Sequence, residues 1–215
     1  MIVFFDCETT GLPKDWQAPV ENTENWPRLV QLAWLVYDLA ENKILEKNYL
    51  IKPVDFEIPL SATNIHRITQ EQALESGLLV EEVLKKFKAD VDQAEFLVAH
   101  NIDFDEKIIK AELIRAEMDN FIDQKKKICT MLASKDYCQL KNRSGIGYKL
   151  PTLGELHYKL FEELFTDAHD AQVDTQILAK CFFELKKIKV IDLFKDFSTT
   201  EIKPEPEEKN QGSLF

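Results

Sequence analysis

Two carboxylates one position apart stand directly after the first apolar stretch of the chain. Asp6 and Glu8 follow residues 2–5, which read IVFF and are typical of a buried strand. Side chains along a strand alternate between its faces, so both carboxylates are expected on the same face. Two negative charges this close are tolerable when a cation lies beside them, and Mg²⁺ binds carboxylate oxygens. The pair alone favours a metal site only weakly, because 38 of the 215 residues are acidic.

A second group of acids lies in the stretch AHNIDFDEKII, at the end of a predicted strand. Open α/β sheets place their sites where strands run into helices. Asp103 and Glu106 have the spacing of a capping box, so Asp103 is readily explained as a helix N-cap. Asp105 would lie in the first turn, where an acid suits the helix dipole. Local structure explains both aspartates, so it does not indicate which of them is the functional carboxylate.

The third stretch, DAHDAQVDTQILAKC, contains a histidine five residues before an aspartate. On one helix His169 and Asp174 would point about 140° apart. They can converge only if His169 lies in the loop before the helix, and Asp170 is a suitable N-cap for that arrangement. Ala171, one turn before Asp174, would leave space above the carboxylate. A lone histidine is more often structural than catalytic, so this stretch is ambiguous by itself.

Together the three stretches resemble the DnaQ-like (DEDDh) 3′-to-5′ exonucleases, the family that includes the proofreading epsilon subunit of bacterial DNA polymerase III. FDCETTGL resembles the first exonuclease motif, HNIDFD the second and AHDAQVD the third. The motifs occur in the family's order, and the resemblance covers about residues 2–185. It implies an RNase H-like fold and a metal-dependent nuclease that releases nucleoside 5′-monophosphates.

The resemblance also implies a role for each acid. Asp6, Glu8, Asp105 and Asp174 match the ligands of two divalent cations, Mg²⁺ or Mn²⁺, and the match selects Asp105 over Asp103. Two such cations roughly 3.5 to 4 Å apart can activate a water and stabilise a leaving oxygen. His169 matches the general base, a role that suits a side chain able to take a proton near neutral pH.

Substrate contacts are implied at three further places. NIHRIT (residues 64–69) resembles the segment in which a histidine contacts the substrate near its 3′ end, although an ordinary loop histidine is an equal interpretation. The Thr-Thr-Gly turn would line the pocket for the terminal nucleotide, and two residues of the second motif would support it. The substrate-binding residues implied are Thr9, Thr10, Gly11, His66, Asn101 and Phe104.

Five apolar stretches are expected to form strands and five others to form helices. The expected strands are residues 2–5, 30–39, 44–53, 95–100 and 128–132, and the expected helices are residues 69–74, 80–91, 105–115, 151–161 and 170–185. Pro151 is expected at the first position of the fourth helix, and Asp170 at the start of the last. This order predicts an α/β domain with a mixed five-stranded sheet flanked by helices.

The composition limits the classes of protein to consider. A chain that is 45% hydrophobic can bury one core, and we expect an exonuclease domain over residues 1–197. Four cysteines without a C-x-x-C pair suggest neither a zinc site nor a disulfide framework. No signal peptide or membrane span is expected, so the predicted protein is soluble and cytoplasmic.

The net charge of −11 argues against a protein that coats nucleic acid by general electrostatics. If the protein binds nucleic acid, it must do so through a local basic patch. Residues 125–127 (KKK) and 141–149 (KNRSGIGYK) are the candidates, and each could equally be a solvated loop.

Residues 198–215 are polar and contain two prolines and four glutamates, so we expect a disordered tail. Its last five residues, QGSLF, resemble the pentapeptide with which bacterial replication proteins insert into the sliding clamp. Gln211, Leu214 and Phe215 are therefore candidate partner-binding residues, because a tether raises local substrate concentration without new contacts.

Alternatives remain open at this level. Relatives that trim RNA carry the same five catalytic and metal residues, so DNA is favoured over RNA without being decided, since the choice depends on contacts to the 2′-OH. A non-catalytic binding module tethered to the clamp is a second alternative. The chain contains no polymerase domain, so a proofreading partner would be a separate DNA polymerase subunit.

Overall fold

The computed structural model describes residues 1–165 and 169–193 of the 215-residue chain. The expected boundary at residue 197 and the whole of the tail, with Gln211, Leu214 and Phe215, lie outside the described residues. The domain boundary and the clamp-binding peptide therefore stay predictions.

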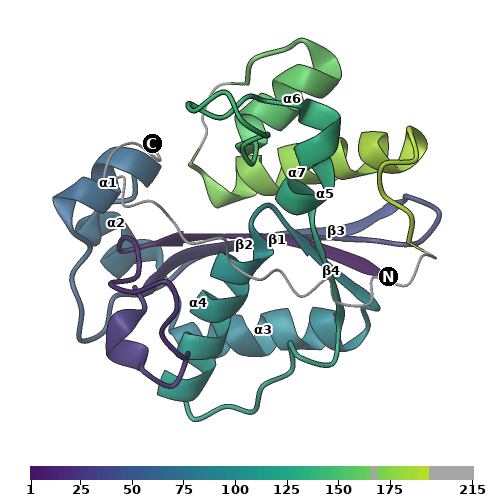
Figure 1. The fold of residues 1–215 in the computed structure, drawn as a ribbon. Helices are drawn as coiled ribbons and strands as arrows, with labels where there is room; N and C mark the ends of the chain where they lie inside the picture. Colours follow the sequence, from purple (N-terminus) through teal and green to yellow (C-terminus); the bar gives the residue numbers. More distant parts are fainter. Residues whose placement is uncertain (166–168, 194–215) are drawn as a thin grey trace.

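A five-stranded sheet forms the centre of the described fold, with strand order β3-β2-β1-β4-β5 (Figure 1). Antiparallel pairing joins β2 to β1 and to β3, whereas β4 pairs in parallel with β1 and with β5. The prediction of a mixed five-stranded sheet is confirmed. The strands are β1 (Ile2–Thr9), β2 (Leu29–Tyr37), β3 (Lys43–Leu50), β4 (Phe96–Ala99) and β5 (Lys126–Cys129).

Helices cover both faces of this sheet. In Figure 1, α3 and α4 lie on one face, α5, α6 and α7 lie on the other, and α1 and α2 lie beside one end of the sheet. A short 3₁₀ helix, η1 (Thr23–Asn25), precedes β2. The helices are α1 (Leu60–His66), α2 (Gln70–Ser76), α3 (Val80–Asp92), α4 (Ile102–Arg115), α5 (Thr130–Cys138), α6 (Leu153–Phe161) and α7 (Ala171–Lys187).

The apolar start of β1 is explained by its central position between two helix layers. Val3 and Phe5 belong to the core cluster formed with α3 and α4. Ile2 and Phe4 face the other layer, where the rings of Phe4 and Phe182 lie 5.0 Å apart between centroids. Full burial of a side chain of this size stabilises the fold by about 2 kcal/mol. Charged residues are therefore tolerated in this strand only towards its end.

Two expected strands end earlier than the sequence suggests. β5 stops at Cys129, opposite the last residue of β4, and α5 begins at Thr130. The prediction of a strand over residues 128–132 is wrong at its end because β4 offers no partner beyond Ala99. Likewise β3 ends at Leu50, and Ile51 forms only an isolated bridge with residue 78. The helices α1 and α5 were not predicted.

The start of α4 corrects the interpretation of Asp103 as a helix cap. Asn101 is the N-cap, in a left-handed conformation with φ of 74°, which asparagine adopts more readily than most residues. The helix therefore begins three residues before the expected position. Asp103 lies in its first turn and pairs with Lys107 at 2.8 Å.

The last two helices begin with capping residues. Thr152 caps α6 through a capping box with Glu155, so Pro151 lies just before the helix rather than at its first position as predicted. Asp170 caps α7, as the sequence predicts, and its side chain accepts a hydrogen bond from the Gln172 N–H. No helix in the described parts of the chain is both long enough and apolar enough to cross a membrane.

Candidate active site

The carboxylates of β1 lie where the sheet opens. β4 pairs with β1 only as far as Phe4, so the second half of β1 has a strand neighbour on the β2 side alone. Asp6 and Glu8 occupy this half, and both line one cavity of about 470 Å³. The sequence-based expectation that the two side chains share a face agrees with this placement. The end of a central strand beside a diverging neighbour is a usual place for a site in an α/β sheet.

Asp105 fills the position that β4 leaves empty. Its side-chain Oδ1 accepts a hydrogen bond from the Cys7 N–H at 3.1 Å, so α4 holds a carboxylate against the backbone between Asp6 and Glu8. Asp105 is 3% exposed. The side chain of Asp103 is 69% exposed and is paired with a lysine at the surface. The structure therefore brings Asp105 to the two carboxylates of β1 and leaves Asp103 outside.

His169 and Asp174 converge in the manner that their spacing requires. His169 lies in the loop before α7 with a left-handed φ of 71°, and its N–H donates to Asp174 Oδ2 at 2.9 Å. Among the described residues, Glu8, His169 and Asp174 form a group whose candidate ligand atoms all lie within 4.8 Å of one another. The end of β1 and the start of α7, which are distant in sequence, thus supply one cluster.

A buried glutamine that the sequence reasoning missed holds the start of α7 on the sheet. Gln31, 3% exposed, lies opposite Glu8 in the pairing of β1 with β2. Its Oε1 accepts from the Ala171 N–H at 3.1 Å, and its Nε2 donates to Asp170 at 3.2 Å. The available signal was a single amide in the otherwise apolar strand LVQLAWLV. Gln31 therefore positions the turn that carries His169 and Asp174.

The cavity also contains most of the residues expected to contact substrate. Thr9, Gly11, His66 and Phe104 line it, together with apolar side chains from α1 and from the turn after β1. Gly11 has a φ of 148°, a conformation that side-chain-bearing residues rarely adopt, which explains a glycine in this turn. Asn101 does not line the cavity and serves instead as the cap of α4.

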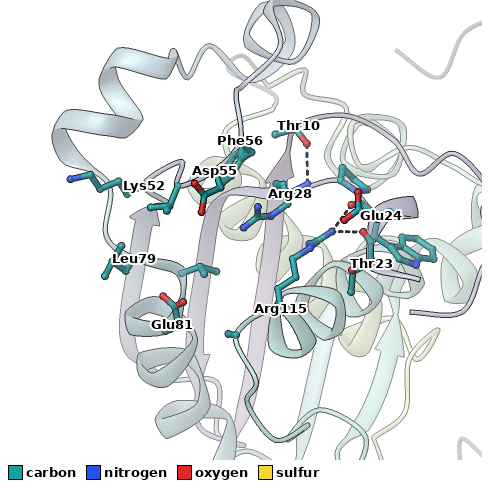
Figure 2. A pocket seen from close by; sticks show the side chains of 15 residues that line it. Thr10, Thr23, Glu24, Arg28, Lys52, Asp55, Phe56, Leu79, Glu81 and Arg115 are labelled. Carbon is teal, nitrogen blue, oxygen red and sulfur yellow. Dashed lines mark hydrogen bonds between the residues drawn. The ribbon is translucent and has the colours of Figure 1, made fainter. Parts of the chain in front are cut away.

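Thr10 faces a different cavity, on the other side of the strand end (Figure 2). Its hydroxyl accepts a hydrogen bond from the Arg28 N–H at 2.9 Å. The expectation that Thr10 lines the same pocket as Thr9 is therefore not met, because successive side chains point to opposite sides.

This second cavity, of about 630 Å³, is larger but its central charges are already paired. Arg28 and Arg115 approach the carboxylate of Glu112 at 2.9 and 2.8 Å, and Glu112 is 1% exposed. The guanidinium of Arg28 also lies 4.3 Å from the centre of the Phe56 ring. A buried acid between two arginines is a satisfied structural arrangement. The smaller cavity is the one with unbalanced charge.

His66 has an unused hydrogen-bonding atom in the carboxylate cavity. Its ring is 4% exposed, and Nδ1 accepts from the Ile68 N–H at 3.1 Å. That bond places the proton of the neutral ring on Nε2, which has no hydrogen-bond partner within the described residues. Burial lowers the pKa of His66, which favours this neutral form. A buried donor without a partner is costly, so the atom suits a bound ligand.

Burial raises the pKa of all four carboxyl groups, and repulsion from neighbouring acids adds to the effect for Asp6, Glu8 and Asp174. Burial, followed by repulsion from Asp105 and Asp174, holds the pKa of Asp6 well above its ordinary value. Burial raises the pKa of Glu8 and of Asp105 to about 8 each, and that of Asp174 to about 6. No lysine or arginine is among the described residues that line the cavity. The site therefore has a shortage of positive charge.

A mixed sheet of this strand order, with carboxylates gathered at the end of its central strand, defines an α/β protein with the RNase H-like fold. A family model described as an exonuclease, RNase T, matches residues 3–182, and the chain belongs to this family.

Solved structures support the fold. *E. coli* Exonuclease I in complex with a dT13 oligonucleotide superposes with a TM-score of 0.68 at 19% identity, covering 86% of this chain and 40% of that chain. Exonuclease I from Methylocaldum szegediense superposes with a TM-score of 0.68 at 21% identity, covering 86% of this chain and 40% of that chain. The zinc-bound form of E. coli ExoI with single-stranded DNA superposes with a TM-score of 0.68 at 18% identity, covering 88% of this chain and 41% of that chain. The chain thus spans about two fifths of the length of these enzymes. A search among curated proteins finds no match.

Proposed function

We propose that the protein is a metal-dependent 3′-to-5′ exonuclease that shortens DNA and releases nucleoside 5′-monophosphates. One observation carries the proposal: Asp6, Glu8, Asp174 and His169 line one cavity, and no lysine or arginine is among its described lining residues. The buried carboxylate of Asp105 lies directly beside them, on the backbone N–H between Asp6 and Glu8. Family membership supports the reaction class, and the arrangement of the acids supports the proposed site.

The donor set fits divalent cations. Asp6, Glu8, Asp105 and Asp174 offer hard carboxylate oxygens, which Mg²⁺ and Mn²⁺ prefer, and no lysine or arginine among the described lining residues balances their charge. These four residues would hold the two cations. Bound cations would supply charge stabilisation at the scissile phosphate and lower the pKa of the attacking water.

The remaining residues have separate tasks. His169 is exposed, lies next to the acids, and accepts the proton of the attacking water for release to solvent. Its N–H bond to Asp174 keeps the loop in place while the side chain changes charge. Thr9, Gly11 and Phe104 shape the space for the terminal nucleotide, and His66 Nε2 donates to it near the 3′ end.

DNA is the proposed substrate because the Exonuclease I structures of the same fold were determined with DNA oligonucleotides. A role in proofreading or repair, like that of the epsilon subunit, goes with this proposal, as do binding to a sliding clamp through QGSLF and to a separate polymerase chain. An RNA-trimming activity is the outcome to be tested beside it.

The test compares 5′-labelled single-stranded DNA and RNA of the same sequence, with Mg²⁺, Mn²⁺ or EDTA. Progressive shortening of the labelled strand that requires metal supports a 3′-to-5′ exonuclease, and the faster substrate decides between DNA and RNA. Immediate release of the labelled nucleotide would indicate the opposite direction.

Asp105→Asn and Asp103→Asn make a matched pair for this experiment, since both replace an acid in the first turn of α4. We expect a loss of at least two orders of magnitude in rate for Asp105→Asn, as for other ligands of catalytic groups, and little change for Asp103→Asn. Equal rates in the two variants, or no cleavage by the parent protein, would overturn the proposal.

A further inference from the structure

An acidic exonuclease needs a local basic surface to hold the strand that leads to its active site. Phosphate contacts by lysine and arginine supply most of the affinity of proteins for single strands, and this chain has a net charge of −11. Two segments are rich in lysine and arginine, residues 125–127 and residues 141–149. The two segments differ in how far their charges are paired within the protein.

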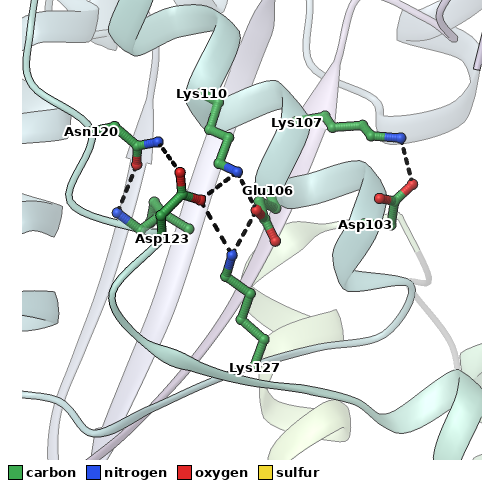
Figure 3. Close-up of polar contacts among 8 residues, drawn as sticks. Asp103, Glu106, Lys107, Lys110, Asn120, Asp123 and Lys127 are labelled. Carbon is green, nitrogen blue, oxygen red and sulfur yellow. Dashed lines mark hydrogen bonds and ion pairs between the residues drawn. The ribbon is translucent and has the colours of Figure 1, made fainter. Parts of the chain in front are cut away.

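The first segment is already used within the protein. Lys125 donates to two backbone carbonyl oxygens, at 3.1 and 3.0 Å, and Lys126 pairs with Glu95 at 2.9 Å. Lys127 pairs with Glu106 at 2.7 Å. Figure 3 shows Lys127 within a cluster of two lysines and two acids that joins α4 to the segment before β5. These charges are compensated, so residues 125–127 do not form a basic patch.

The second segment keeps its charge. Lys141 and Arg143 are exposed, and neither forms an ion pair with any residue in the described ranges 1–165 and 169–193. Lys149, the third cation of the segment, pairs with Glu155 at the start of α6. Two unpaired positive charges therefore lie two residues apart.

Residues 141–149 form a small hairpin that is held in shape by its own hydrogen bonds. An antiparallel bridge joins Lys141 to Tyr148, and Asn142 Nδ2 donates to the Ile146 carbonyl at 3.0 Å. The Gly145 N–H donates to the Asn142 carbonyl at 2.9 Å. Gly145 has a φ of 74°, and the second glycine of the turn has a φ of 71°. Glycine adopts such angles without strain, so the turn is preformed.

The tip of this hairpin presents an apolar side chain to solvent. Ile146 is 80% exposed, although burial would stabilise a side chain of this size by about 2 kcal/mol. An apolar side chain on the same hairpin as two cations that form no ion pair within the described residues matches a single strand, whose unstacked bases offer apolar faces beside each phosphate.

The base of the hairpin lies close to segments that form the active site. His100 Nε2 lies 2.9 Å from the Pro151 carbonyl oxygen, and His100 directly precedes the cap of the helix that carries Asp105. Phe165 approaches the start of α6, where a Cβ on Gly154 would lie 3.6 Å from its ring. His169 follows four residues later. In Figure 1 the hairpin, which connects α5 to α6 along the chain, lies on the side of the sheet that α7 also covers.

We propose that residues 141–149 bind the backbone of a single-stranded nucleic acid upstream of its 3′-terminal nucleotide. Lys141 and Arg143 contact two phosphates, and Ile146 packs against a base. This inference rests on the proposed exonuclease function and extends it, because it states how the strand is held outside the catalytic cavity.

The experiment measures kcat and KM of the full chain on a 12-nucleotide DNA and on a dinucleotide, which has no phosphate upstream of the scissile one. For Lys141→Ala/Arg143→Ala we expect a several-fold increase in KM for the 12-mer, with kcat and both constants for the dinucleotide unchanged. The slope of log(kcat/KM) against log[salt] should become shallower by about 1.4, since each phosphate contact on a single strand contributes about 0.7. Ile146→Ala should increase KM for the 12-mer without changing the slope.

Lys85→Ala/Lys86→Ala is the matched control, because it removes two exposed lysines of α3 on the other face of the sheet. It should behave like the parent protein. Equal effects of the two double variants, or an unchanged salt slope, would overturn the proposal for the hairpin. If the parent protein cleaves neither substrate, the proposed function fails, and fluorescence anisotropy of a labelled 12-mer with the same variants in EDTA still decides whether the hairpin binds single strands.

Discussion

At the scale of single residues, the site is defined by acidic side chains without a lysine or arginine among the described residues that line the cavity. Asp6, Glu8, Asp105 and Asp174 are brought together by elements distant in sequence, and burial disfavours the charged form of each. Repulsion from neighbouring acids adds to this for Asp6, Glu8 and Asp174. A protein gains no stability from such a group of acids. Under the proposed function, bound cations would offset this cost.

The stability of the metal-free protein should fall as the pH rises from 5 to 8. The folded-state pKa of Glu8 and of Asp105, each about 8, exceeds the ordinary carboxyl value, so the native state binds more protons than the unfolded state in this window. The stability from these protonated groups is complete below pH 4 and is lost as pH approaches 8. Thermal melting in EDTA should show a decrease of several degrees, and Mg²⁺ or Mn²⁺ at pH 8 should restore it.

Asp105→Asn should flatten this pH profile, whereas Asp103→Asn should leave it unchanged because the side chain of Asp103 lies at the surface. A melting temperature that is constant between pH 5 and 8 in EDTA would contradict the electrostatic interpretation.

His66→Ala should weaken substrate binding and also cost about 1 kcal/mol of stability. The substitution removes the donor at Nε2, and the Ile68 N–H loses the acceptor that Nδ1 provided. KM on the dinucleotide should rise, as measured by steady-state kinetics. His157→Ala removes another buried histidine, on α6, and should lower stability without raising KM. An increase of KM in both variants would point to a general loss of structure.

At the scale of elements, the active site depends on how α7 is seated on β2 and β3. Gln31 binds Asp170 and the first N–H of the helix, and it also donates to Asn48 at 3.0 Å. Asn48 in turn donates to Gln172 at 3.0 Å. These amides fix the position of the helix start, which apolar packing alone would leave free to slide by small amounts. Gln31 therefore links the capping of α7 to the positions of the proposed catalytic residues His169 and Asp174.

Gln31→Leu should destabilise the protein by about 1 to 3 kcal/mol, because a buried N–H and the Asp170 carboxylate lose their partner. It should lower kcat more than it raises KM, since His169 and Asp174 lose their support while the nucleotide pocket remains. Denaturant unfolding and steady-state kinetics measure the two effects. Gln93→Leu, on the exposed end of α3, is the control. Unchanged kcat in a folded Gln31→Leu protein would exclude a positioning role.

At the scale of the whole molecule, the domain combines a strongly acidic surface with a proposed nucleic-acid substrate. The net charge of −11 implies weak and salt-sensitive binding unless the protein is held near its substrate. The hairpin of residues 141–149 is one proposed element that would hold the nucleic acid on the domain. The C-terminal QGSLF, which lies outside the described residues, is a second.

Leu214→Ala/Phe215→Ala should abolish binding to a sliding clamp, because these two residues are the proposed apolar anchors of the peptide. The rate on free single-stranded DNA should not change. Surface plasmon resonance on immobilised clamp measures the first effect, and Ser213→Ala within the same peptide is the control. Equal clamp affinity in the double variant and the parent protein would refute the tether.

The sequence by itself determined the directions of side chains relative to their own elements. Strand alternation placed Asp6 and Glu8 on one face, and the five-residue spacing with Asp170 as cap placed His169 in the loop before α7. These features depend on local geometry that a few neighbouring residues specify. The order of the expected strands and helices along the chain predicted the mixed sheet.

Only the tertiary structure decided which elements meet. Resemblance to the family favoured Asp105 over Asp103, but its physical reason is that β4 ends at Ala99 and leaves the Cys7 N–H open to a carboxylate from α4. The neutralisation of residues 125–127 and the role of Gln31 likewise depend on partners 20 to 140 positions away. Local patterns carry no information about such partners, because a hydrogen bond or ion pair forms wherever packing brings its two groups together.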